Sequence, residues 1–169
     1  MTDLDTLELL LRPAGGGIHT VSTGRAEQAA LQQRLYGAVD AAGVHARWRE
    51  ALAAVANARV AIVAVPSDTG AGLVRGAAFG PAALRTALLE LMPDFPARAA
   101  TAGIVDVGDV FVVPQLLHDE MLSDTQLAAT RAALYPNLVE AERARLPVSP
   151  LSIAAEAVAR LLAINPRLK

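Results

Sequence analysis

The chain has no cysteine among its 169 residues. This absence excludes a disulfide scaffold, a thiolate zinc site and a cysteine nucleophile, and we expect a cytoplasmic protein. Aromatic residues make up only 4% of the sequence. No apolar run reaches the roughly 18 residues that a membrane-spanning helix requires, so no membrane segment is expected. The first ten residues are acidic and lack the basic start of a signal peptide.

The chain has no large excess of positive or negative charge. It contains 15 basic and 17 acidic residues, and its net charge is −2. Nucleic acid or an anionic membrane would require a basic patch or stripe, and the sequence has none. We therefore expect neither of them as a partner. Apolar residues, in contrast, make up 53% of the chain, which is enough to form a buried core.

Two short β-branched runs stand between segments of helical pattern. Residues 59–65 show no alternation of polarity after Arg59, as is typical of strands buried in a parallel sheet. Residues 103–107 are a second short strand segment. Between them, Gly80-Pro81 opens a helix. Its predicted buried stripe consists of Ala83, Leu84, Ala87, Leu88 and Leu91. The dipeptide Gly108-Asp109 predicts a turn after the second run.

Helical segments precede and follow these strands. The apolar periodicity of residues 25–58 predicts two helices divided at Gly43. Ser123 and Gln126 have the spacing of a capping box, and Ser149-Pro150 begins a last helix. This order predicts an α/β fold with a β-α-β core and a right-handed crossover.

We divide the chain into an N-terminal arm with helices, residues 1–58, and a βαβα portion, residues 59–169. Two parallel strands do not form a stable sheet by themselves, since parallel sheets have several strands and helices on both faces. We therefore expect further strands, either from a longer parent chain or from a partner subunit.

The segment from Ala64 to Arg85 resembles the first β-loop-α unit of the ureohydrolases, the family of arginase, agmatinase and formimidoylglutamase. The matching residues are Ser67, Asp68, Gly70, Gly72, Arg75, Gly76, Gly80, Pro81 and Arg85. Residues 104–110, with their Asp-x-Gly-Asp, are similar to the second strand of that family. Residues 150–164 are similar to the helix before its first metal-binding strand. The resemblance implies a partial three-layer α/β/α fold of the arginase type, with an incomplete parallel sheet.

The resemblance also implies a pair of Mn²⁺ ions that activate a hydroxide for attack on a guanidino or amidino carbon. The ligand motifs of the family, Gly-Gly-Asp-His, Asp-Ala-His-x-Asp and Asp-x-Asp-x-x-Asp, do not occur in this sequence. We therefore expect no catalytic residue, metal ligand or cofactor in this chain, and no activity from it alone. Once completed, it is expected to form a homo-oligomer that hydrolyses a C–N bond of a linear guanidine or amidine. The alternative is a non-catalytic binding or assembly module that retains half of the fold.

The loop after the first strand is the candidate site, because open α/β sheets bind ligands at the carboxyl ends of their strands. Asp68 and Arg75 are the candidate substrate-binding residues. Four others shape the loop: Ser67, Gly70, Gly72 and Gly76. The alternative is a glycine-rich loop that only turns the chain. Its glycine spacing is one residue too long for a dinucleotide fingerprint, so nucleotide binding is disfavoured.

Two clusters that contain acidic residues are further candidate sites. His118, Asp119 and Glu120 are adjacent, and adjacent side chains diverge, whereas a metal requires convergent ligands. We expect a polar loop there. Asp106 and Asp109 are interpreted as turn residues that bind the backbone.

Overall fold

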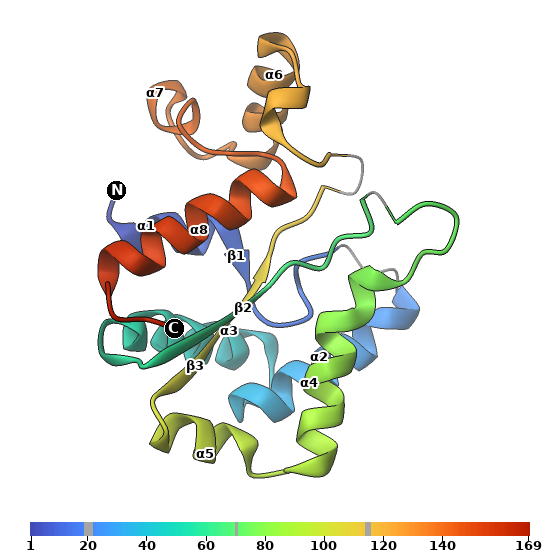
Figure 1. The fold of residues 1–169 in the computed structure, drawn as a ribbon, viewed down its shortest axis with the longest axis vertical. Coiled ribbons are helices and arrows are strands. Elements are labelled where there is room, and N and C mark those ends of the chain that lie inside the picture. Colours follow the sequence, from blue (N-terminus) through green and yellow to red (C-terminus); the bar gives the residue numbers. More distant parts are fainter. Residues whose placement is uncertain (19–21, 70, 114–115) are drawn as a thin grey trace.

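The computed structural model describes residues 1–18, 22–69, 71–113 and 116–169 (Figure 1). Its elements are α1 (Asp3–Leu10), β1 (Leu11–Arg12), α2 (Ser22–Tyr36), α3 (Ala41–Ala54), η1 (Val55–Asn57), β2 (Val60–Ala64), η2 (Ala77–Phe79), α4 (Gly80–Leu91), α5 (Phe95–Thr101), β3 (Ile104–Val110), η3 (Asp119–Met121), α6 (Asp124–Leu134), α7 (Glu140–Arg143) and α8 (Pro150–Ile164), where η marks a 3₁₀ turn. None of the described helices is long and apolar enough to cross a membrane.

The sheet has the strand order β1-β3-β2. Strands β2 and β3 are parallel, from Val60 opposite Ile104 to Ala64 opposite Asp109, which confirms the predicted β-α-β core. The N-terminal arm adds β1, which pairs antiparallel with β3. A strand of two residues carries no sequence pattern of its own, and β1 was not predicted.

Strand β3 continues through Gly108 and Asp109, so the turn predicted there is wrong. The register shifts between Ile62 and Val63, and Gly108 has a φ of +91°. A Cβ on Gly108 would lie 2.0 Å from the carbonyl oxygen of Arg12. Gly108 therefore adopts the backbone conformation of a β-bulge inside the strand. Because it has no side chain, the backbone of β1 can lie close to it.

The helix boundaries follow local capping chemistry. The break predicted at Gly43 is wrong, because α2 ends before Gly37, which has a φ of +62°, and α3 starts after Asp40. The Asp40 carboxylate accepts a hydrogen bond from the Gly43 N–H, so Gly43 lies in the first turn of α3. The capping box of Ser123 and Gln126 is confirmed at the start of α6.

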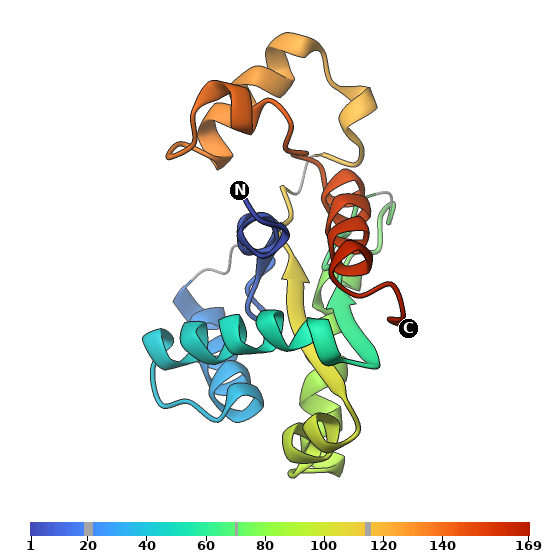
Figure 2. The same cartoon turned by 90° about the vertical axis from the view of Figure 1, so that its left-hand side faces the viewer.

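Helices cover both faces of the sheet. On one face, α1 and α8 pack together and against β3, with buried side chains such as Leu10, Ile153 and Ala157 (Figure 2). On this face the indole N–H of Trp48 donates to the Val107 carbonyl at 2.9 Å. Arg85 of α4 meets the side chain of Asp106. Because side chains alternate along a strand, Asp106 and Val107 point to opposite faces, which places α4 across the sheet from α8.

Helix α4 does not bury the stripe predicted for it. Leu84 and Leu91 are 70% and 82% exposed, whereas Arg85 and Leu89 are buried. The described part of the fold therefore leaves Leu84 and Leu91 of α4 uncovered.

Candidate functional site

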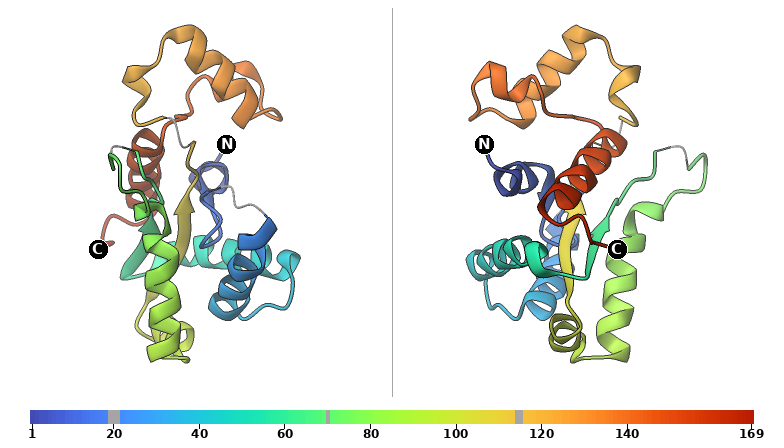
Figure 3. Two further views of the ribbon diagram at one scale, coloured as in Figure 1. Left: turned by 90° about the vertical axis from the view of Figure 1, so that its right-hand side faces the viewer. Right: turned by 60° about the vertical axis from the view of Figure 1, so that its left-hand side comes forward.

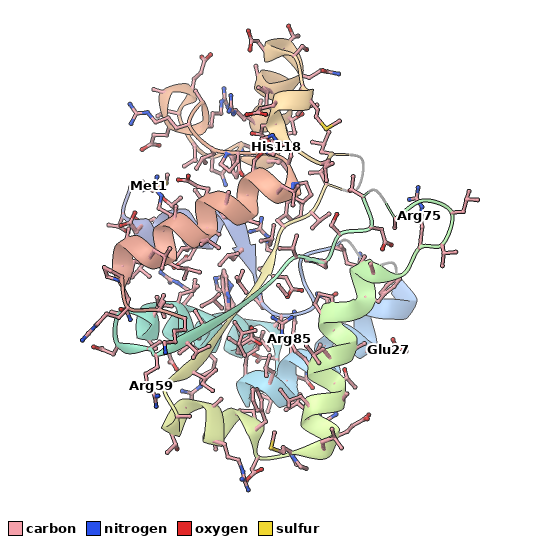
Figure 4. The ribbon with its side chains drawn as sticks, viewed as in Figure 1. Met1, Glu27, Arg59, Arg75, Arg85 and His118 are labelled. Atoms are coloured by element: carbon pink, nitrogen blue, oxygen red, sulfur yellow. The ribbon has the colours of Figure 1, made fainter. Side chains whose placement is uncertain are left out.

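The buried guanidinium of Arg85 reaches from α4 to two carboxylates of β3. Its side chain, 4% exposed, points from α4 toward the sheet (Figure 4). The Nε and Nη2 atoms donate to the two oxygens of Asp106 at 2.7 and 2.9 Å, and Nη1 donates to Asp109 at 2.5 Å. One cation thus bonds to two carboxyl groups at once.

Backbone groups complete the cluster. The Gly15 N–H donates to the second oxygen of Asp109 at 2.8 Å, and the Gly108 N–H donates to Asp106 at 2.9 Å. Arg85 also donates to the Gly108 carbonyl at 3.2 Å. These bonds fasten α4, the bulge of β3 and the N-terminal arm to one another, and we name the set of Arg85, Asp106 and Asp109 the ionic brace.

Burial shapes the ionisation of this region. It raises the pKa of Asp109 in spite of the charge of Arg85. Burial by itself lowers the pKa of Arg85, but the hydrogen bonds and charges of Asp106 and Asp109 outweigh it and raise that pKa above its ordinary value. Burial, together with the charge of Asp106, also raises the pKa of Tyr36, whose hydroxyl accepts from the Ala14 N–H.

The ionic brace was not predicted from the sequence. The interpretation of Asp106 and Asp109 as backbone-bonding residues is confirmed, but their position in a turn is wrong, since both lie in β3. A charged residue inside the apolar helix α4 was the available signal, because an arginine is seldom buried without a carboxylate partner.

A cavity of about 430 Å³ lies beside the brace, between α2, α4 and Pro66 at the end of β2. Apolar side chains such as Leu31 and Phe79 line most of it, and Glu27, Glu90 and Asp109 contribute its carboxylates. A second cavity of about 460 Å³ lies at the amino ends of the strands, between α3 and α5. Only the first lies where open α/β sheets bind ligands.

The loop between β2 and α4 is held by Asp68. Its carboxylate accepts from the Ala78 N–H at 2.8 Å and from the Gly76 N–H at 3.2 Å. Gly72 and Gly76 have positive φ angles of +69° and +142°, which favour glycine. At the start of the loop, the Ser67 hydroxyl donates to Thr69 at 3.1 Å.

The predicted site residues do not converge in this structure. Asp68 bonds within its own loop, and Arg75 is exposed in the part of the loop that projects from the body of the molecule (Figure 4). Gly70 lies outside the described residues. Contact of Asp68 or Arg75 with a substrate stays a prediction.

We expect Asp68→Ala to loosen this loop, because the Gly76 and Ala78 N–H groups lose a charged acceptor. The free energy of unfolding should fall by about 1 kcal/mol, and hydrogen exchange of both amides should become faster. Arg75→Ala is the matched control from the same loop, and an exposed substitution of this kind should change stability by less than about 0.5 kcal/mol. Unchanged exchange at Ala78 in the Asp68 variant would contradict this role.

A pair of Mn²⁺ ions does not fit the acidic residues present. Among the described residues, no three His, Asp or Glu side chains form a group that could hold a metal. The carboxylates of the brace are occupied by Arg85. Asp119 accepts from the Ser149 N–H at 2.8 Å, and His118 accepts from the Glu120 N–H through Nδ1. The cluster at 118–120 is therefore structural, and Asp119 fixes the backbone of Val148 and Ser149 just before α8.

The structure thus contains a parallel β-α-β unit, and the loop at the carboxyl ends of its strands is held by Asp68. These features define an α/β domain of the class that binds ligands at the carboxyl ends of its strands. A model of the Arginase family matches residues 58–143, just over half of the chain, from just before β2 to the end of α7. The chain therefore belongs to the arginase family, as the resemblance to ureohydrolases implied. Comparisons with curated proteins and with solved structures gave no match.

Proposed function

We propose that this chain is the N-terminal part of a manganese-dependent ureohydrolase of the arginase, agmatinase or formimidoylglutamase type, acting in the cytoplasm. The net reaction adds water to a guanidino or amidino carbon and breaks its C–N bond. The amine departs with a proton, and urea or an amide remains. The match of β2, its loop, α4 and β3 to the Arginase family carries this proposal.

The proposed role of residues 1–169 is to build one wall of the active site. Asp68 shapes the loop at the carboxyl edge of the sheet, and the ionic brace fixes α4 and β3 beneath it. The carboxylates of Asp68, Asp106, Asp109 and Asp119 are engaged in structural contacts. The proposal therefore assigns the metal ligands to other polypeptide, and residues 1–169 alone are expected to be inactive.

The test compares two samples in the presence of Mn²⁺: residues 1–169, and the protein purified from its source. Each is assayed for bound manganese and for hydrolysis of arginine, agmatine and formimidoylglutamate. We expect stoichiometric manganese and one hydrolytic activity in the source protein only. Stoichiometric manganese on residues 1–169, or a source protein without metal and activity, would contradict the proposal.

A further inference from the structure

The cavity beside the ionic brace lies between one face of α2 and one face of α4, two helices that pack against each other (Figure 3). Glu27 and Leu31 of α2 line it and are four positions apart. Ala82, Thr86 and Glu90 of α4 line it at the same interval. Each set therefore lies on one helical face. Alanines form much of the α4 side, and such small side chains leave space between the helices that larger ones would fill.

The walls of this cavity suit an apolar ligand. Its volume of about 430 Å³ lies within the range of small-molecule sites. Leu31 is buried in the wall, whereas Phe79, just before α4, is 63% exposed. An apolar body in the cavity would cover part of the Phe79 ring, and removal of apolar surface from water is favourable. A hydrocarbon chain or ring is therefore the expected body of a ligand.

The charges that line the cavity are all carboxylates in the described part of the chain. Glu27 and Glu90 are exposed, and neither forms an ion pair with a described residue. Asp109, in contrast, is buried at the inner end and already bonded to Arg85. The guanidinium of Arg85 would repel a second cation at that end. The uncompensated negative charge is consequently that of the two glutamates, on the side of the cavity that faces solvent.

We propose that this cavity binds an organic monocation with an apolar body, such as an alkylammonium or arylalkylammonium ion. Its charged end lies toward Glu27 and Glu90, and its apolar body lies against Leu31 and Phe79. A neutral ligand of the same shape gains only the apolar contacts, and a carboxylate ligand meets charges of its own sign. This inference goes beyond the proposed function, because the site requires neither Mn²⁺ nor hydrolysis.

Three ligands that share one hydrocarbon body test the proposal: hexylamine, hexan-1-ol and hexanoate. At about pH 7 the first is a cation, the second is neutral and the third is an anion. Each is titrated at low salt into the 169-residue chain, and the chemical shifts of the backbone amides give both the Kd and the location. We expect hexylamine to bind about three- to tenfold more tightly than hexanol, since exposed ion pairs contribute modestly. The shifts should lie in α2 and α4, and hexanoate should bind more weakly than hexanol.

Matched variants then locate the charge and the space. The double variant Glu27→Gln, Glu90→Gln should lose the preference for hexylamine over hexanol. The control Glu120→Gln, Glu140→Gln removes the same charge from exposed positions outside the cavity and should keep that preference. Thr86→Leu fills the cavity and should weaken hexylamine and hexanol alike. Circular dichroism reports whether each variant is folded.

Three results would overturn the proposal: no binding of any ligand, equal affinity for hexylamine and hexanol, or an equal loss of preference in the control variant. The first two are measured on the unmodified chain, so they do not depend on the folding of a variant. None of the three involves manganese or activity, and the proposed function is therefore tested separately.

Discussion

Replacing Arg85 with methionine is expected to lower the free energy of unfolding by about 3–5 kcal/mol, because buried Asp109 and partly buried Asp106 lose their counter-ion. Asp109 is 1% exposed and has no other cation within bonding distance in the described residues. For a chain of this size the loss corresponds to a fall in Tm of roughly 6–20 °C. Urea unfolding followed by circular dichroism measures the free energy.

The triple variant Arg85→Met, Asp106→Asn, Asp109→Asn is the matched control, because it removes the charges together with the cation. It should regain a large part of the lost stability, since replacing a whole buried ion pair costs less than breaking one. If the triple variant were as unstable as Arg85→Met, the loss would come from packing and not from uncompensated charge.

The effect of Arg85→Met should depend on pH. Burial already raises the pKa of Asp109, and removing Arg85 raises it further. A carboxyl whose pKa is raised in the folded state contributes stability that is complete below the unfolded pKa and is lost as the pH rises through the folded pKa. The variant should therefore be closer to the parent protein at about pH 4 than at about pH 8. An equal difference at both pH values would exclude carboxylate charge as the cause.

Gly108→Ala is expected to be the second large effect, with a loss of roughly 3 kcal/mol or more. Its Cβ would lie 2.0 Å from the backbone oxygen of Arg12, and the residue has a φ of +91°. Strand β1 must then leave β3, taking with it the Gly15 N–H that binds Asp109. Thermal unfolding, together with hydrogen exchange in β1, measures both consequences.

Two other glycines separate the causes of this loss. Gly72 has a φ of +69° but no atom within 4 Å of an added Cβ, so Gly72→Ala should cost only the strain of its backbone, about 1 kcal/mol. Gly80 is helical and open, and Gly80→Ala should stabilise by about 0.5–1 kcal/mol. A Gly108 variant no less stable than the Gly72 variant would contradict the close approach of β1.

The parallel core could be predicted from the sequence because its signals are local. The apolar run of residues 59–65 becomes β2, and Gly80-Pro81 stands at the start of α4. The brace could not be predicted in this way, since Arg85 and Asp109 are 24 positions apart and no periodicity links them. The apolar spacing in α4 predicted a buried face that includes Leu84 and Leu91, whereas the ion pairs turn the face of Arg85 inward.

For the candidate loop, too, the sequence predicts the backbone conformation but not the partners of the side chains. Its glycines predict the turn, and two of them adopt the positive φ angles that favour glycine. The partners of Asp68 are N–H groups eight and ten residues away, and a sequence pattern does not say whether a carboxylate meets a substrate or the backbone.

The intact mass of the protein purified from its source tests the central claim most directly. The account predicts a mass well above the 17.6 kDa of residues 1–169, with the metal-ligand motifs of the family following Lys169. A mass of 17.6 kDa would contradict it. The chain would then act as a binding or assembly module that keeps half of the fold.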